Sequence, residues 1–175
     1  VLRTSMELGG NAPFIVLDDA DVDTAVSSAM VAKLRNGGAA CTAANRFFVA
    51  RGIAQEFSRR LADAMGSVVF GPGLDTSVQL GASVSLAERD KIAALVDEAV
   101  AGGAELLVGG TVPTGSGAFY PATAMMVDAD ATILGREIFG PVAPIVVVDS
   151  DDEAIDLANA SEFGLISYVM SGDAA

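Results

Sequence analysis

The run Ala143-Pro144-Ile145-Val146-Val147-Val148 is the most strand-like stretch of this 175-residue sequence. It is apolar throughout and shows no alternation with polar residues. Strands that helices cover on both faces, as in parallel sheets, have this continuous pattern. We also interpret 13–17 and 46–50 as strands, so the sequence predicts a buried, parallel sheet at the centre of the fold.

Helical segments alternate with these strands. Asp21 is placed to cap a helix over 22–35, which Gly37-Gly38 would end. Capping pairs of the Ser-x-x-Glu type precede two further helices. The other predicted helices are 53–65, 89–101 and 154–159, the other predicted strands are 105–108, 120–127 and 166–170, and the main loops are 71–84 and 109–117. This alternation predicts a single compact domain of the α/β class.

Charge and composition exclude several classes of function. The chain has 10 basic and 23 acidic residues, a net charge of −13, and no histidine. Without a basic patch we expect no nucleic-acid partner. Without imidazole we expect neither a Ser–His–Asp triad nor a metal site. No apolar run approaches the ~20 residues of a membrane span, so no membrane partner is expected. A single cysteine and no secretory signal suggest a cytoplasmic location.

Cys41 is the one thiol of the chain and follows Gly37-Gly38-Ala39-Ala40, immediately after the predicted helix. These small residues leave room for a substrate to approach the sulfur. A thiolate is a good nucleophile where its surroundings favour ionisation. The alternative is a buried cysteine with only a structural role.

Two carboxylates and one guanidinium are further candidates. Glu7 lies among apolar residues and glycines, where burial would favour a general base and exposure a simple solvated charge. Glu137 precedes a rigid turn and is either functional or only part of a strand entry. Arg35 is equally compatible with a solvated cation at a helix C-terminus. The sequence contains no G-x-G-x-x-G motif or P-loop, so it predicts no complete dinucleotide site in this chain.

Taken together, these motifs resemble those of the aldehyde dehydrogenase superfamily. Glu7-Leu8-Gly9-Gly10 is followed 34 residues later by Cys41, and then by Glu137-Ile138-Phe139-Gly140-Pro141-Val142. The similarity extends over 13–23, 71–81, 119–121 and 153–164. It implies a three-layer αβα architecture with an open, mostly parallel sheet, in which residues 1–175 are the catalytic domain. We therefore expect an excised piece of a longer protein, without its cofactor-binding domain and C-terminal segment.

The resemblance also implies a mechanism. The Cys41 thiolate would attack an aldehyde, giving a thiohemiacetal whose oxyanion is held by the Cys41 N–H and an amide from outside this chain. Hydride transfer to NAD or NADP would leave a thioester, which water activated by Glu7 would hydrolyse. Glu137 matches the family residue that binds the nicotinamide ribose, Phe139 one that lies against the cofactor, and Leu8 one that contacts the carboxamide.

The segments 33–36 and 41–46 are most similar to succinate-semialdehyde dehydrogenases. In that branch the arginine matching Arg35 holds the substrate carboxylate, a group that a guanidinium binds well. We expect a homo-oligomeric enzyme for succinate semialdehyde or a similar acid aldehyde, with this chain inactive alone. The alternatives are another aldehyde substrate and a non-catalytic module that only self-associates. Ala39 replaces a usual glutamine or other polar residue, and Ala43 excludes a regulatory disulfide found in some relatives.

Overall fold

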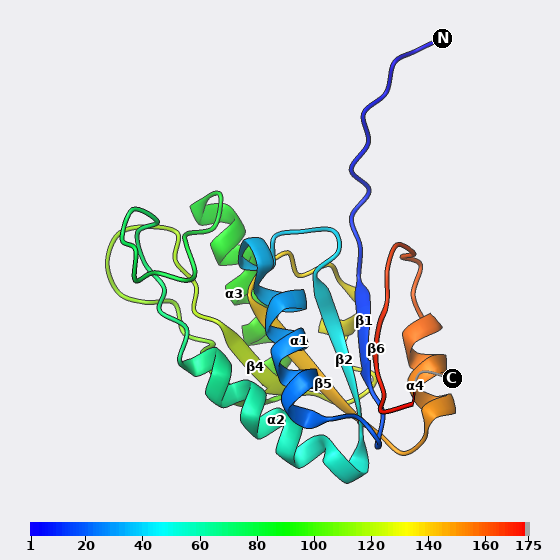
Figure 1. The fold of residues 1–175 in the computed structure, drawn as a ribbon. Coiled ribbons are helices and arrows are strands. Elements are labelled where there is room, and N and C mark those ends of the chain that lie inside the picture. Colours follow the sequence, from blue (N-terminus) through cyan, green and yellow to red (C-terminus); the bar gives the residue numbers. More distant parts are fainter. Residues whose placement is uncertain (174–175) are drawn as a thin grey trace.

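A computed structural model describes residues 1–173, and Figure 1 shows its central sheet. Within these residues six strands form one sheet in the order β3-β4-β5-β2-β1-β6. The strands are β1 (Ala12–Val16), β2 (Ala44–Ala50), β3 (Glu105–Val108), β4 (Thr123–Met126), β5 (Val142–Val148) and β6 (Tyr168–Met170). Neighbouring strands are parallel except for the antiparallel pair β3 and β4. The predicted α/β fold with a mostly parallel sheet is confirmed.

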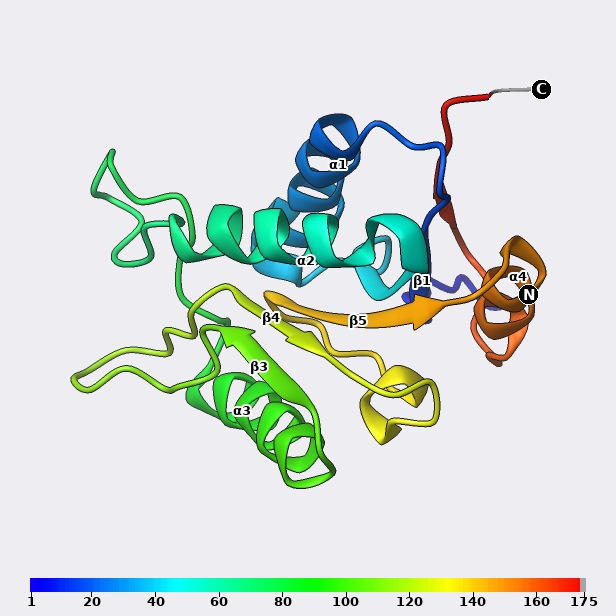
Figure 2. The ribbon, with the colours of Figure 1, turned by 90° about the horizontal axis from the view of Figure 1, so that it is seen from below.

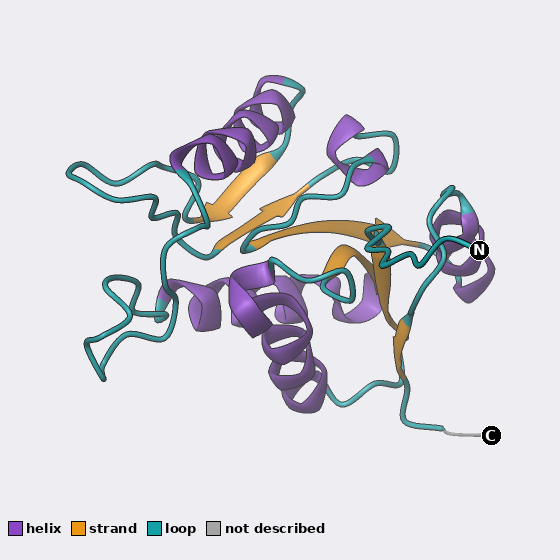
Figure 3. Ribbon diagram, turned by 90° about the horizontal axis from the view of Figure 1, so that it is seen from above, coloured by secondary structure: helices purple, strands orange, loops and turns teal. Residues whose placement is uncertain are grey.

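Helices cover both faces of the sheet, which gives three layers (Figures 2 and 3). Helices α1 (Val22–Leu34) and α2 (Arg51–Gly66) lie on one face. The other face carries α3 (Leu86–Ala101), the short 3₁₀ helix η2 (Thr132–Gly135) and α4 (Asp151–Asn159). Phe47 is buried in the core on the α1 and α2 face and its neighbour Phe48 in the core on the opposite face, as alternation along a strand requires. Both faces are therefore apolar, which explains the continuous apolar runs.

The predicted N-caps are present. Asp21 accepts a hydrogen bond from the Thr24 N–H at 2.8 Å, and Ser150 accepts one from the Glu153 N–H at 3.1 Å. Ser85 accepts from the Glu88 N–H at 3.2 Å. The predicted starts of α3 and α4 were wrong by three residues, because each helix begins directly after its capping serine. Helix α2 likewise begins at residue 51 instead of 53, and the predicted strand 120–127 contains only the four residues of β4.

The topology gathers the predicted functional motifs at one edge of the sheet. Strands β5, β2 and β1 are adjacent and parallel, so their amino ends lie together. The segments 7–11, 39–43 and 136–141 lead into these three strands. We call this side the amino edge; it faces the top of Figure 1, where the N-terminal segment extends away from the sheet. The opposite side, where these strands end, is the carboxyl edge.

No helix within residues 1–173 combines the length and apolar character needed to cross a membrane.

Candidate active site at the amino edge

A left-handed turn delivers Cys41 to the amino end of β2. After α1 the chain forms the 3₁₀ helix η1 (Arg35–Gly38), in which Asn36 and Gly37 have φ of 53° and 64°. The Asn36 side-chain amide donates to the Ala39 carbonyl at 2.7 Å and holds the turn. At Gly38, also left-handed, a Cβ would collide with the Gly140 carbonyl oxygen. Gly38 therefore has to be a glycine, because it lies where the segment 39–43, which we call the Cys41 loop, meets the loop before β5.

The segment before β1 packs directly against the same place. A Cβ on Gly10 would collide with the Cys41 carbonyl oxygen, so only a glycine permits this approach. The Gly10 N–H donates to Glu137 Oε1 at 2.8 Å. A Cβ on Gly9 would lie 2.6 Å from the other oxygen of the same carboxylate. The structure therefore brings together three of the predicted motifs, which are far apart in sequence.

Cys41 itself is free and only partly buried. Among the described residues, neither its sulfur nor its backbone N–H makes a hydrogen bond. A buried structural cysteine would be enclosed, so this placement favours the interpretation of Cys41 as a nucleophile. The unused N–H is a donor that can stabilise an oxyanion formed at the carbon bonded to the sulfur.

Glu7 and Leu8 are placed differently. Both belong to the exposed segment 1–8, and both oxygens of Glu7 accept from the Gly9 N–H at 3.2 Å. No hydrogen bond joins Glu7 to Cys41 or Glu137 in the described part of the chain. The burial that would favour a general base is therefore absent in this chain, although Glu7 lies only three residues before the Gly10–Cys41 contact.

Arg35 lies at an open cavity of about 530 Å³ between α1, the Cys41 loop and β6. Ala40 and Thr42, the two neighbours of Cys41, line the same cavity. Tyr168 also lines this cavity and donates its hydroxyl to the Thr42 carbonyl at 2.8 Å. Arg35 is exposed and forms no ion pair within residues 1–173. Its guanidinium is thus available to an anion that enters beside the thiol.

A second cavity, of about 430 Å³, lies on the side of the Cys41 loop that carries Ala39. Phe139 and Leu80 line it together with Ala39. Phe139 has a φ of 54°, a strained conformation for an aromatic residue that commonly marks functional sites. Close by in sequence, the Glu137 carboxylate keeps one oxygen without a hydrogen bond to any described residue.

An aromatic wall and a carboxylate suit a nicotinamide ring and its ribose hydroxyls, so the residues present fit one end of NAD(P).

Sequence reasoning missed the buried polar residues beneath the site. Lys33, at the end of α1, is completely buried and donates to Asn45 Oδ1 at 2.8 Å. Burial lowers the pKa of the Lys33 ammonium to about 7. A signal was present in the sequence, since Lys33 continues the spacing of four set by Ala25 and Ala29 on the buried face of α1.

Arg46 is a second buried cation, in β2. Its guanidinium donates to the carbonyls of Asn11, Leu157 and Ala158 at 2.9, 3.1 and 3.0 Å. A cation at the C-terminal end of α4 complements the helix dipole. Arg46 thereby fastens α4 and the start of β1 to the strand that follows Cys41.

Comparisons with known proteins agree with this site. The aldehyde dehydrogenase family model matches residues 1–175. Succinate-semialdehyde dehydrogenase of Paenarthrobacter nicotinovorans is 54% identical over 174 residues, which cover 99% of this chain and 39% of that protein. For 3-sulfolactaldehyde dehydrogenase of Pseudomonas putida, the identity is 42% over 99% of this chain and 36% of that protein. The crystal structure of succinate-semialdehyde dehydrogenase from Burkholderia pseudomallei matches with a TM-score of 0.93 at 39% identity, over 97% of this chain and 36% of that one.

This chain thus spans well under half the length of the relatives it matches. Within that length the match is continuous, and it includes the segments of Glu7, Cys41 and Glu137. The resemblance inferred from the sequence motifs is confirmed. The chain belongs to the aldehyde dehydrogenase family.

Proposed function

We propose that this chain is the catalytic domain of an NAD(P)-dependent dehydrogenase that oxidises succinate semialdehyde or a similar acid aldehyde. One observation carries the proposal: Cys41 is free and only partly buried, and its two neighbours Ala40 and Thr42 line the same cavity as the unpaired Arg35. The similarity to a succinate-semialdehyde dehydrogenase at 54% identity supports the same substrate class.

The reaction begins at Cys41. Its thiolate attacks the aldehyde carbon, a C–S bond forms, and the carbonyl oxygen becomes an oxyanion. The Cys41 N–H, which makes no hydrogen bond within residues 1–173, would donate to that oxygen, and such preorganised donors are a major source of catalysis. Arg35 orients the substrate by binding its carboxylate, which can be bidentate with a guanidinium.

Glu137 and Phe139 would hold the nicotinamide end of the cofactor on the other side of the loop. The family uses NAD(P), and when bound this group would supply the hydride acceptor needed to turn the thiohemiacetal into a thioester. Cys41 is then the leaving group of a thioester. Glu7 takes a proton from the attacking water, the C–S bond breaks, and the acid leaves with the Cys41 thiolate restored. The exposed Glu7 carboxylate is open to water in this chain.

The role of Arg35 separates this function from oxidation of uncharged aldehydes. In the full-length enzyme containing this chain, R35A is expected to raise KM for succinate semialdehyde at least tenfold and to leave KM for butyraldehyde within twofold. The control is R59A, because Arg59 is an exposed arginine on α2 that pairs with Asp63. Equal KM values for succinate semialdehyde in R35A and the wild type would show that Arg35 does not bind the substrate carboxylate. The 175-residue chain alone is expected to lack activity.

We also propose that the full-length enzyme is a homo-oligomer. Strand β6 pairs with β1 on one side and with no strand of residues 1–173 on the other. The unpaired backbone N–H and C=O groups of such an edge can form hydrogen bonds with a strand of another chain. Apolar side chains beside it, including Val169 at 53% exposure, remain in contact with solvent. Light scattering of the full-length protein tests this, and a monomeric mass would contradict it.

A further inference from the structure

Burying a lysine such as Lys33 lowers the stability of a fold, and Lys33 has no role in the function proposed above. It is 0% exposed, and no carboxylate of residues 1–173 forms an ion pair with it. Its one hydrogen bond is to the Asn45 side chain. An unpaired buried ammonium destabilises a fold, and an apolar residue of the same volume would avoid that penalty. The site thus contains a lysine that packing alone does not explain.

A series of hydrogen bonds extends from Lys33 across the amino edge. Asn45 is 1% exposed, and its Nδ2 donates to the Gly10 carbonyl at 3.4 Å. The N–H of the same Gly10 donates to Glu137 at 2.8 Å. We call Lys33, Asn45, Gly10 and Glu137 the Lys33 network. It joins α1, β2, the segment before β1 and the loop before β5.

Each member of the Lys33 network lies beside a part of the proposed site. Lys33 is two residues before Arg35, and Asn45 is four residues after Cys41. Gly10 packs on the Cys41 carbonyl, and Glu137 is the cofactor carboxylate. A displacement of the Gly10 peptide would therefore move the support of Cys41 and of Glu137 together.

In its ammonium form, which predominates below its pKa of about 7, Lys33 fixes the orientation of the Asn45 amide. It has three donors and no acceptor, so Asn45 must present Oδ1 to Lys33, which directs Nδ2 to the Gly10 carbonyl. With an apolar residue at position 33 the amide could turn over, and its oxygen would then face the Gly10 carbonyl oxygen. We propose that Lys33 is a positioning residue: through the Asn45 amide it fixes the Gly10 peptide, and with it the relative places of Cys41 and Glu137.

The surroundings of Lys33 support this role. Desolvation alone accounts for its pKa of about 7. Within residues 1–173 no charged or titratable group on the packed segments forms a hydrogen bond or ion pair with the ammonium; these groups are Glu7, Asp23, Arg35, Cys41, Arg46, Arg136 and Glu137. The Asn45 amide is thus the main group through which Lys33 can act.

The kinetic test rests on the proposed function and uses the full-length enzyme below pH 7, where Lys33 is mainly an ammonium group. We compare K33M, N45A and the double variant, with K91M as the control, because Lys91 is the other lysine of this chain and lies exposed on α3. K33M and N45A are each expected to lower kcat about tenfold, with KM for succinate semialdehyde within twofold. The double variant should be no slower than the slower single variant, because both residues act through one amide. K91M should match the wild type.

Hydrogen–deuterium exchange gives a readout that does not depend on activity. K33M should accelerate exchange about tenfold in peptides covering 7–14 and 39–45, while peptides of α2 and α3 stay unchanged. If K33M does not fold, K33Q provides the same test, because a glutamine amide can accept as well as donate and does not fix Asn45. Multiplicative losses in the double variant, or unchanged exchange over 7–14, would overturn the positioning role. A wild-type enzyme that oxidises no aldehyde would instead refute the proposed function, and exchange would still decide the role of Lys33.

Discussion

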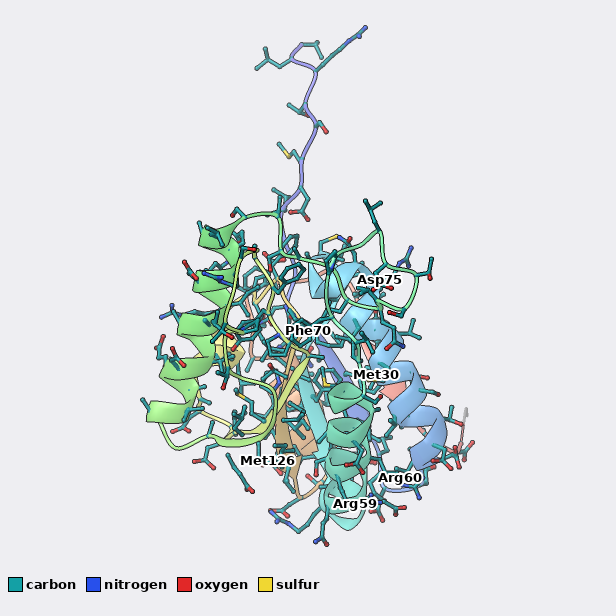
Figure 4. The ribbon with its side chains drawn as sticks, turned by 90° about the vertical axis from the view of Figure 1, so that its left-hand side faces the viewer. Met30, Arg59, Arg60, Phe70, Asp75 and Met126 are labelled. Carbon is teal, nitrogen blue, oxygen red and sulfur yellow. The ribbon has the colours of Figure 1, made fainter. Side chains whose placement is uncertain are left out.

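The two edges of the sheet use polar residues in opposite ways. At the carboxyl edge, charges are exposed or half-buried and pair with each other: Arg51 with Asp149, and Arg60 with Asp23. In Figure 4, Arg60 lies at the end of the molecule opposite the extended N-terminal segment. At the amino edge, Lys33 and Arg46 are buried and bond to an amide and to carbonyls. Exposed pairs contribute little to stability, whereas a buried charge that loses its partners destabilises the fold strongly.

This placement departs from the usual arrangement of open α/β sheets, whose ligands bind at the carboxyl ends of the strands. Here the carboxyl ends run almost directly into helices. Strand β2 is followed at once by α2, and β5 reaches the Ser150 cap of α4 after one residue. The amino ends instead receive irregular, glycine-containing segments that pack on one another. The edge that holds the candidate site is therefore the one with close backbone contacts.

The largest expected effect is at the Gly10–Cys41 contact. G10A should destabilise the fold by about 3 kcal/mol, because its methyl group cannot fit beside the Cys41 carbonyl. It should also reduce aldehyde oxidation by the full-length enzyme. G73A is the matched control, since a Cβ there meets no atom within 4 Å. Urea unfolding of both variants provides the comparison, and equal stability would show that the two segments are not tightly packed.

The next effect concerns the pH dependence of stability. The pKa of Lys33 is about 7 in the fold and 10.5 in its ordinary state, so between these values the unfolded chain holds a proton that the native chain lacks. The free energy of unfolding should thus rise with pH, by up to ~1.4 kcal/mol per unit from this one group.

K33M should remove this slope between pH 7 and 9, and K91M should keep it. Urea unfolding at several pH values measures both. Identical slopes in K33M and the wild type would mean that Lys33 is not a buried, largely neutral amine above pH 7.

A smaller effect is expected at the carboxyl edge. S150A removes the N-cap of α4 and should lower the free energy of unfolding by about 1 kcal/mol. S150T keeps a capping hydroxyl and should fall between S150A and the wild type. Neither variant should change kcat of the full-length enzyme by more than twofold. A large loss of activity in S150A would show that catalysis depends on the carboxyl edge as well as on the amino edge.

The smallest effect is expected for the exposed pair of Arg51 and Asp149. Both side chains are about two-thirds exposed, so water screens their attraction. D149N should leave the unfolding midpoint within experimental error at moderate salt. A clear destabilisation would show that the carboxyl edge, too, depends on specific polar contacts.

Local signals in the sequence predicted most of the fold. The apolar run of β5 and the caps at Asp21 and Ser150 depend on neighbouring residues, and the structure confirms them. The exact start of α4 was missed because the first three residues after its cap are acidic, whereas α3 begins with the apolar Leu86 and Ala87 and its start carried a signal that was overlooked.

The candidate site was predictable only in part. Its motifs could be named from the sequence, but the Gly10–Cys41 contact and the bond from Gly10 to Glu137 join residues distant in the chain. Local patterns of residue type along the sequence do not show which distant segments come into contact. Lys33 was overlooked because a lysine near a helix end resembles a solvated charge, although its spacing from Ala29 places it on the buried face.

The central claim is that Cys41, at the amino edge, is the nucleophile of an aldehyde oxidation. Its most direct test is to capture the acyl enzyme. The E7Q variant of the full-length enzyme, which should hydrolyse the thioester slowly, is mixed with succinate semialdehyde and NAD(P)⁺, quenched in acid and mapped by mass spectrometry. We predict a succinyl adduct on the peptide containing Cys41, absent when C41S is added to E7Q. An adduct on another residue, or undiminished aldehyde oxidation by C41S, would contradict the claim.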